Sequence, residues 1–332
     1  MKSSDSNSLP PHRRFPIWIL GPWVLALGFL VSFSTYYLTH LEPTSVSISS
    51  PVPTAQKNIH VPSKTATNTT EPRPTILTST PITPTPKPSP IKPTSTQVIS
   101  KRIIIGKSVE GRYLEVFQFG SGNIERLIIA GIHGGYEWNT IALADALIQY
   151  LKDHPELVPP DQTLYILRSL NPDGEARSHG IKGRANEHGV DLNRNFPDHW
   201  RADWSREGCW NYLPITAGTG PASEPEAKAL ISFIEAHNVD ALINYHSAAL
   251  GIFAGGKPAT ARSLDLAEEI ASISTYPYPP IDTGCQFSGQ LIDWAAKKGI
   301  AAVDIELTNH QDIDFKQNLL ILNKFLSWDP PD

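Results

Sequence analysis

Residues 43–99 limit what the chain can fold into more than any other part of the sequence. These 57 positions contain 12 prolines and 21 serines or threonines but no glycine. A segment of this composition has too few apolar side chains to form a hydrophobic core, and it is typical of an extended, partly polyproline linker. The chain therefore has one folded part, residues 100–332, which is long enough for a single α/β domain.

An uncharged, apolar segment precedes this linker. Residues 15–39 contain no charged side chain and are rich in Ile, Leu, Val, Trp and Phe, and a helix of about 20 such residues spans a bilayer. Arg13 and Arg14 stand directly before it, which predicts a cytoplasmic N-terminus. A cleaved signal peptide, and hence a secreted protein, is the alternative. The expected order is a basic cytoplasmic tail (1–14), a transmembrane signal anchor (15–41), a linker (42–99) and an extracytoplasmic domain (100–332) at the cell membrane.

The folded part is acidic and contains both cysteines of the chain. Residues 100–332 carry 20 Lys and Arg against 30 Asp and Glu, a net charge of −10, which argues against nucleic acid as a partner. Export from the cytoplasm would allow Cys209 and Cys285 to form a disulfide. Two small buried side chains are the alternative, because a pair of cysteines does not by itself establish a bridge.

Apolar segments alternate with helical patterns along the folded part. The apolar run 126–132 ends in His133-Gly134-Gly135, and residues 140–151 have apolar side chains at helical spacing, which predicts a buried strand, a glycine turn and a helix. Further strands are expected at 163–170, 240–246 and 300–307, and a capping box beginning at Ser223 predicts a helix over 227–236. This alternation predicts an α/β fold of three α/β/α layers with a mixed, mainly parallel central sheet.

Three polar residues stand at predicted strand ends, where α/β sheets place functional groups: His133, His246 and Glu306. A single histidine at such a position is more often structural than a metal ligand, but the surrounding motifs change this interpretation. They are Asn171-Pro172-Asp173-Gly174, Arg184, the run from Asp191 to Phe196, Ser223 to Glu226, Asp293-Trp294 and Ile305-Glu306-Leu307. In this order, over about 200 residues, the motifs resemble those of the zinc carboxypeptidases of the M14 type.

The resemblance implies a zinc peptidase with one Zn²⁺ per domain. Two histidines and a carboxylate can hold zinc while leaving a position open for water, and the resemblance assigns these ligand roles to His133, Glu137 and His246. It also implies that Glu306 is the general base. Arg184 would stabilise the oxyanion, Asn193 and Arg194 would bind the terminal carboxylate of the substrate, and Asp191 would orient a ligand histidine.

Two positions depart from the family pattern. The family's first metal motif is His-x-x-Glu, whereas this chain has one more residue between His133 and Glu137. We expect the intervening glycine pair to form a bulge that brings Glu137 to the metal; a weakened site is the alternative. Cys285 stands where the family's mobile tyrosine is expected, and Tyr276 or Tyr278 could take its place.

Asp304 lies two residues before Glu306 on a predicted strand, so the two carboxylates share a face. We therefore expect Asp304 to border the active site and to bind substrate, favouring a departing Lys, Arg or diaminopimelate side chain over Leu or Phe. A solvated or salt-bridged aspartate is the alternative.

These features predict a membrane-tethered, extracytoplasmic zinc metallocarboxypeptidase that hydrolyses C-terminal peptide bonds. The runs Arg184-Ala185-Asn186 and Gly189-Val190-Asp191 also resemble the branch of the family that cleaves the γ-D-glutamyl-diaminopimelate bond of cell-wall peptides. An N-acyl amino acid deacylase with the same metal site is a third hypothesis. A non-catalytic module that binds peptides or cell wall is a fourth, against which the presence of Glu306 argues.

Overall fold

The structure is a computed structural model, and it describes residues 100–204, 209 and 215–330. The predicted cytoplasmic tail, transmembrane anchor and linker, residues 1–99, lie outside the described residues. Within the described ranges, no helix is both long and apolar enough to cross a membrane.

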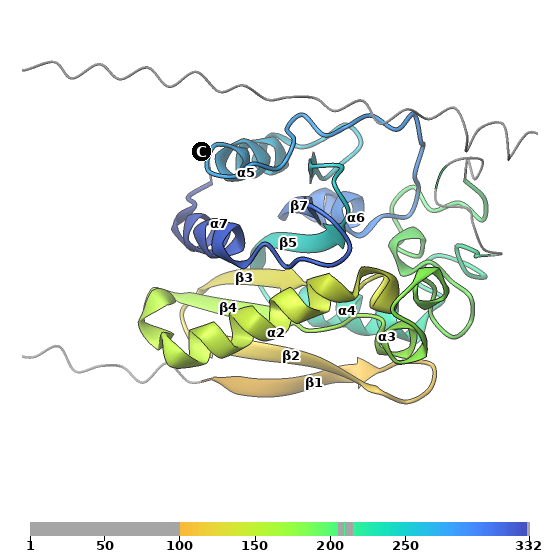
Figure 1. The fold of residues 1–332 in the computed structure, drawn as a ribbon, viewed down its shortest axis with the longest axis horizontal. Coiled ribbons are helices and arrows are strands. Elements are labelled where there is room, and N and C mark those ends of the chain that lie inside the picture. The colour runs from red at the N-terminus through yellow and green to blue at the C-terminus, as the bar shows by residue number, and fades with distance from the viewer. Residues whose placement is uncertain (1–99, 205–208, 210–214, 331–332) are drawn as a thin grey trace, which may run out of the picture. The chain divides into compact units, whose positions relative to one another are not determined.

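A seven-stranded mixed sheet runs through the centre of the folded part (Figure 1), with the strand order β1-β2-β4-β3-β5-β7-β6. The four central strands, β4, β3, β5 and β7, are parallel, whereas the other three pairings are antiparallel. The prediction of a mainly parallel sheet therefore holds for its centre but not for its edges. The strands are β1 (Lys101–Lys107), β2 (Tyr113–Gly120), β3 (Ile124–Ile129), β4 (Gln162–Leu167), β5 (Val239–Ser247), β6 (Ile252–Ala254) and β7 (Ala301–Leu307).

Helices cover both faces of the sheet, as a three-layer fold requires. One hydrophobic cluster packs α2 (Trp138–Asp153), α5 (Ala261–Ala271) and α7 (Phe315–Ser327) against one face. A second cluster packs α4 (Pro225–Glu235) and α6 (Leu291–Lys297) against the other. Because the central strands are buried on both faces, apolar side chains predominate along them, and polar ones stand mainly toward their ends. Short helical segments complete the fold: α3 (Pro172–Arg177) and the 3₁₀ turns η2 (Gly134–Glu137), η3 (Pro155–Leu157), η4 (Ile181–Gly183) and η5 (Leu192–Arg194).

The capping box predicted at Ser223 is wrong. Helix α4 begins at Pro225, its N-cap is Glu224, and no side chain caps its first turn. The Ser223 hydroxyl instead donates a hydrogen bond to Glu224 Oε1 at 2.7 Å. Ser223 stands one residue before the N-cap, outside the position whose side chain accepts from the first turn of a helix.

The carboxyl ends of β3, β5 and β7 meet at one edge of the sheet, because these strands are parallel neighbours. In the pairing of β5 with β7, His246 lies opposite Glu306 and Asn244 lies opposite Asp304. Side chains paired in this way point to the same face of a sheet. Strand register therefore brings the second histidine and both carboxylates to one place.

Candidate active site

The three predicted metal ligands lie together in the protein interior. His133 comes directly before η2, Glu137 ends that turn, and His246 stands near the end of β5; all three are buried, and their ligand atoms lie within 4.8 Å of one another. Glu137 Oε1 is 2.7 Å from His133 Nδ1, and Glu137 Oε2 is 3.0 Å from His246 Nδ1. The two Nδ1 atoms are 3.2 Å apart.

The extra residue of the first motif is accommodated by its two glycines. Gly134 has a φ of +46°, a conformation that favours glycine. A Cβ atom on Gly135 would lie 2.0 Å from the carbonyl oxygen of Ser178. The chain can therefore turn tightly enough for Glu137 to face both histidines, and the predicted bulge is confirmed.

An aspartate lies against the far nitrogen of each ligand histidine. His133 Nε2 lies 3.1 Å from Asp191 Oδ1. His246 Nε2 is 3.5 Å from Asp304 Oδ1 and 2.7 Å from Asn244 Nδ2. In both rings the Nδ1 atom faces Glu137, and the Nε2 atom faces away from it, toward neighbouring side chains that hold the ring in place. Asp191 thus lies against His133, where its predicted role would place it, whereas the contact of Asp304 with His246 was not predicted from the sequence.

These residues fit a zinc ion. Two imidazole nitrogens and a carboxylate oxygen lie within reach of one point, and two histidines with one carboxylate form a zinc ligand set that leaves a fourth position open. With Zn–N bonds of about 2.0–2.1 Å, two nitrogen ligands of a tetrahedral site are about 3.3–3.4 Å apart, close to the 3.2 Å that separates the two Nδ1 atoms.

Glu306 has the environment of a general base. Its Oε2 atom is buried and makes no hydrogen bond within the described part of the chain. The pKa of Glu306 is raised to about 8, chiefly by burial; the charges of Glu137 and Asp304 contribute to the rise, and His246 opposes it. A carboxyl group with this pKa can both take up and return a proton near neutral pH.

Both predicted arginines line the same cavity as the candidate metal ligands. Arg184 Nη2 is 2.9 Å from Asp191 Oδ2, and its Nη1 is 3.5 Å from Glu137 Oε1. Arg194 is buried and donates from Nη1 to the carbonyl oxygen of Asn193 at 2.7 Å. Asn193 uses its own side chain within the protein, since Oδ1 accepts from the Leu291 N–H at 2.9 Å.

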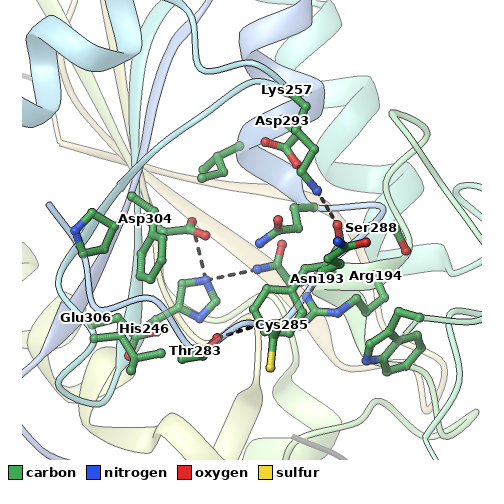
Figure 2. Close-up of a pocket in the computed structure, with 18 of the residues that line it drawn as sticks. Asn193, Arg194, His246, Lys257, Thr283, Cys285, Ser288, Asp293, Asp304 and Glu306 are labelled. Atoms are coloured by element: carbon green, nitrogen blue, oxygen red, sulfur yellow. Dashed lines mark hydrogen bonds and ion pairs between the residues drawn. The ribbon is translucent and has the colours of Figure 1, made fainter. Parts of the chain in front are cut away.

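All eight site residues predicted from the sequence line one cavity of about 1000 Å³. Figure 2 shows Asn193, Arg194, His246, Asp304 and Glu306 around it. Asp304 thus borders the site as strand alternation predicted, although it is also bonded within the protein, because it accepts from Asn244 Nδ2 at 2.8 Å.

The cavity wall contains two further features that sequence reasoning did not place there. Lys257 Nζ lies 3.1 Å from Asp293 Oδ2, so an ion pair faces the cavity. Cys285 also lines it and forms a disulfide with Cys209, with their Cα atoms 5.6 Å apart. Tyr276, one proposed substitute for the family's mobile tyrosine, is buried and donates from its hydroxyl to Asp314.

Comparison with known proteins agrees with this geometry. The zinc carboxypeptidase family model matches residues 94–325. The catalytic chain of carboxypeptidase N from Rattus norvegicus is 31% identical over 176 residues, which cover 46% of this chain and 38% of that protein. Murein peptide amidase A from Escherichia coli K12 is 28% identical over 239 residues, which cover 68% of this chain and 90% of that protein.

The fold is also shared with solved structures. Bovine thrombin-activatable fibrinolysis inhibitor, in complex with tick carboxypeptidase inhibitor, superposes with a TM-score of 0.55 at 24% identity, covering 69% of this chain and 89% of that one. The part of this chain that matches rat carboxypeptidase N spans only 38% of the length of that protein. Since the family model covers most of residues 100–332 and the metal ligands are in place, the chain belongs to the zinc carboxypeptidase family.

Proposed function

We propose that this protein is a zinc-dependent carboxypeptidase that removes the C-terminal residue of peptides, held at the outer face of a membrane by its N-terminal segment. The observation that carries the proposal is the convergence of a two-histidine, one-carboxylate centre, an unpartnered glutamate oxygen and two buried arginines on one cavity. Each group matches one requirement of peptide hydrolysis at a chain end.

The residues divide the reaction among them. Bound zinc would supply an acidified water and polarise the scissile carbonyl. Glu306, which a bound cation would favour in its ionised form, takes a proton from the attacking water and delivers it to the departing amine. Arg184, held in place by Asp191, stabilises negative charge on the carbonyl oxygen. Arg194 binds the terminal carboxylate and so selects the last peptide bond.

A product analysis tests this function. The full chain in detergent is incubated with peptides that have free C-terminal carboxylates and with the same peptides as C-terminal amides, and the products are identified by mass. We expect single C-terminal residues to be lost from the free acids only, and chelation followed by zinc to abolish and restore the activity. Internal cleavage, or equal cleavage of the amides, would contradict the proposal.

Placement outside the cytoplasm is supported by two observations. Residues 15–39 have the composition of a signal anchor, and the Cys209–Cys285 disulfide is typical of an oxidising compartment. Protease added to intact cells or spheroplasts should digest the catalytic domain, and the domain should remain with membranes after a carbonate wash. A domain that is protected from protease, or that is released by the wash, would contradict the proposed tether.

A cell-wall peptide is the second candidate substrate. The side chain of diaminopimelate carries both an ammonium and a carboxylate, and the cavity presents both signs of charge through Lys257, Asp293 and Asp304. Similarity to murein peptide amidase A extends over 90% of that protein. A muropeptide mixture in the same mass assay distinguishes the two, since release of diaminopimelate-containing fragments at a rate above that of ordinary peptides would favour the wall substrate.

We further propose that Asp304 favours a positive charge on the departing side chain. Asp304→Asn keeps the Oδ1 atom that accepts from Asn244 while removing the charge. It should lower kcat/KM for a C-terminal Lys peptide more than for a Leu peptide. The difference should correspond to about 1.5–3 kcal/mol of transition-state stabilisation, the scale of a charged hydrogen bond. Equal losses on both peptides would instead indicate that Asp304 acts only by positioning His246.

A further inference from the structure

Two aromatic rings lie over the guanidinium group of Arg194. Its Cζ atom is 4.1 Å from the ring centroid of Phe287 and 5.6 Å from that of Trp204, and the residue is 2% exposed. Contact with an aromatic face stabilises a guanidinium group and restricts the plane in which it lies. The direction from which Arg194 meets a substrate carboxylate therefore depends on where these rings are held.

The rings belong to a small hydrophobic cluster away from the sheet. Trp204 packs there with three other buried residues, and Phe287 packs against them. Phe287 lies in residues 280–288, which form neither helix nor strand and whose positions 281–284 are exposed. A cluster of this size supplies little packing to fix a loop, and such regions open more readily than the core.

The disulfide joins the two segments that supply the rings. Cys285 is two residues before Phe287, and Cys209 is five residues after Trp204. Beyond Phe287, the Gly289 carbonyl accepts from the Phe196 N–H at 3.0 Å, which holds the other end of the segment close to Arg194. Lys257 also donates to the Phe287 carbonyl. Cys285 and Arg194 both line the cavity (Figure 2), so the covalent bond anchors the part of the wall that contains Phe287.

We propose that the Cys209–Cys285 disulfide positions Arg194, through Phe287 and Trp204, for recognition of the substrate carboxylate, so that reduction of the bridge weakens substrate binding. The inference rests on the proposed function and adds a regulation to the same site. Phe287 is a positioning residue, since it acts on substrate through Arg194. An enzyme of this kind binds its substrate fully only in an oxidising compartment.

The reducing step can be carried out with a trialkylphosphine. The phosphine and one water break the S–S bond, giving two thiols and a phosphine oxide. Phosphorus loses two electrons, the two sulfurs gain them, and water supplies the oxygen and both protons. A phosphine avoids the dithiols that would themselves bind zinc through sulfur.

The test compares kcat and KM of the full chain before and after phosphine treatment, on a peptide with a free C-terminal carboxylate. We expect KM to rise about 3- to 30-fold, the range of a desolvated cation–π contact, with kcat and zinc content nearly unchanged, and reoxidation to restore KM. The double variant Cys209→Ser/Cys285→Ser should have the raised KM without phosphine and should not respond to it.

A ring variant tests the same inference with the bridge intact. Phe287→Leu keeps an apolar side chain but removes the aromatic face, so it should raise KM to a similar extent. Phe287→Tyr keeps the aromatic face, so its KM should stay close to that of the wild type. A KM that is independent of phosphine, or a fall in kcat and zinc content at constant KM, would overturn the inference while leaving the proposed function standing. Absence of turnover in every form with zinc bound would overturn both.

Discussion

At pH 6.5, the variant Glu306→Gln should release about one proton fewer than the wild type when it binds zinc. In chelator-treated protein, burial raises the pKa of Glu306 to about 8, with Glu137 and Asp304 adding to the effect. The group is then about 97% protonated at pH 6.5 and about 24% protonated at pH 8.5. A divalent cation bound beside it favours the ionised form. Zinc binding should therefore expel about one proton from Glu306 at pH 6.5 and about 0.2 at pH 8.5.

Titration calorimetry measures this directly. Zinc is titrated into chelator-treated wild type and Glu306→Gln in buffers of different ionisation enthalpy, and the slope of observed against buffer enthalpy gives the number of protons released. Protons from other groups, such as His246, cancel in the difference between the two proteins. Because the raised pKa favours the protonated form, zinc affinity should rise with pH up to about pH 8, more steeply in the wild type. Equal proton numbers at pH 6.5, or a difference that persists at pH 8.5, would refute the reasoning.

Three further substitutions have defined expectations. Glu137→Gln should lose most of its bound zinc by metal analysis, whereas Asp145→Asn should keep it, because that carboxylate is half exposed and pairs with an arginine instead. Gly135→Ala would place a Cβ 2.0 Å from a backbone oxygen, so both zinc affinity and melting temperature should fall, while Gly220→Ala, with open space around it, should leave both unchanged. Arg126→Met would remove the ion pair of the buried Arg126 with Asp240 and its hydrogen bond to the Trp328 carbonyl. Urea unfolding should show a fall of about 1–3 kcal/mol in the free energy of unfolding; an unchanged value would mean that these bonds contribute little.

The buried strands and the ligands at their ends could be predicted from sequence. Strands β3, β4, β5 and β7 lie close to the ranges expected from their apolar runs, because a strand covered on both faces needs apolar side chains throughout. His133, His246 and Glu306 interrupt or follow those runs, so a polar group at a buried strand end was visible without coordinates. The edge strand β1 and its neighbour β2 are partly exposed and have no such continuous signal.

Contacts that depend on strand register could not be predicted. Asp304 reaches Asn244 and His246 because β7 pairs with β5 in one particular register, and no spacing within either segment specifies that alignment. The pairing of Cys209 with Cys285 could not be predicted either, since the two cysteines are 76 residues apart in the chain. The N-cap of α4 was predicted wrongly because Ser223 has a competing partner in its neighbour Glu224.

The charges of the residues around the candidate metal site are coupled to one another. Four carboxylates, those of Glu137, Asp191, Asp304 and Glu306, stand around the site with the two guanidinium groups of Arg184 and Arg194. If every acid were ionised and both histidines neutral, this part of the interior would carry an excess of two negative charges, which burial strongly disfavours. A proton on Glu306 offsets one of them, and a divalent cation offsets both. Proton and metal therefore compensate the same deficit, and the role of base that we propose for Glu306 requires that the metal has replaced its proton.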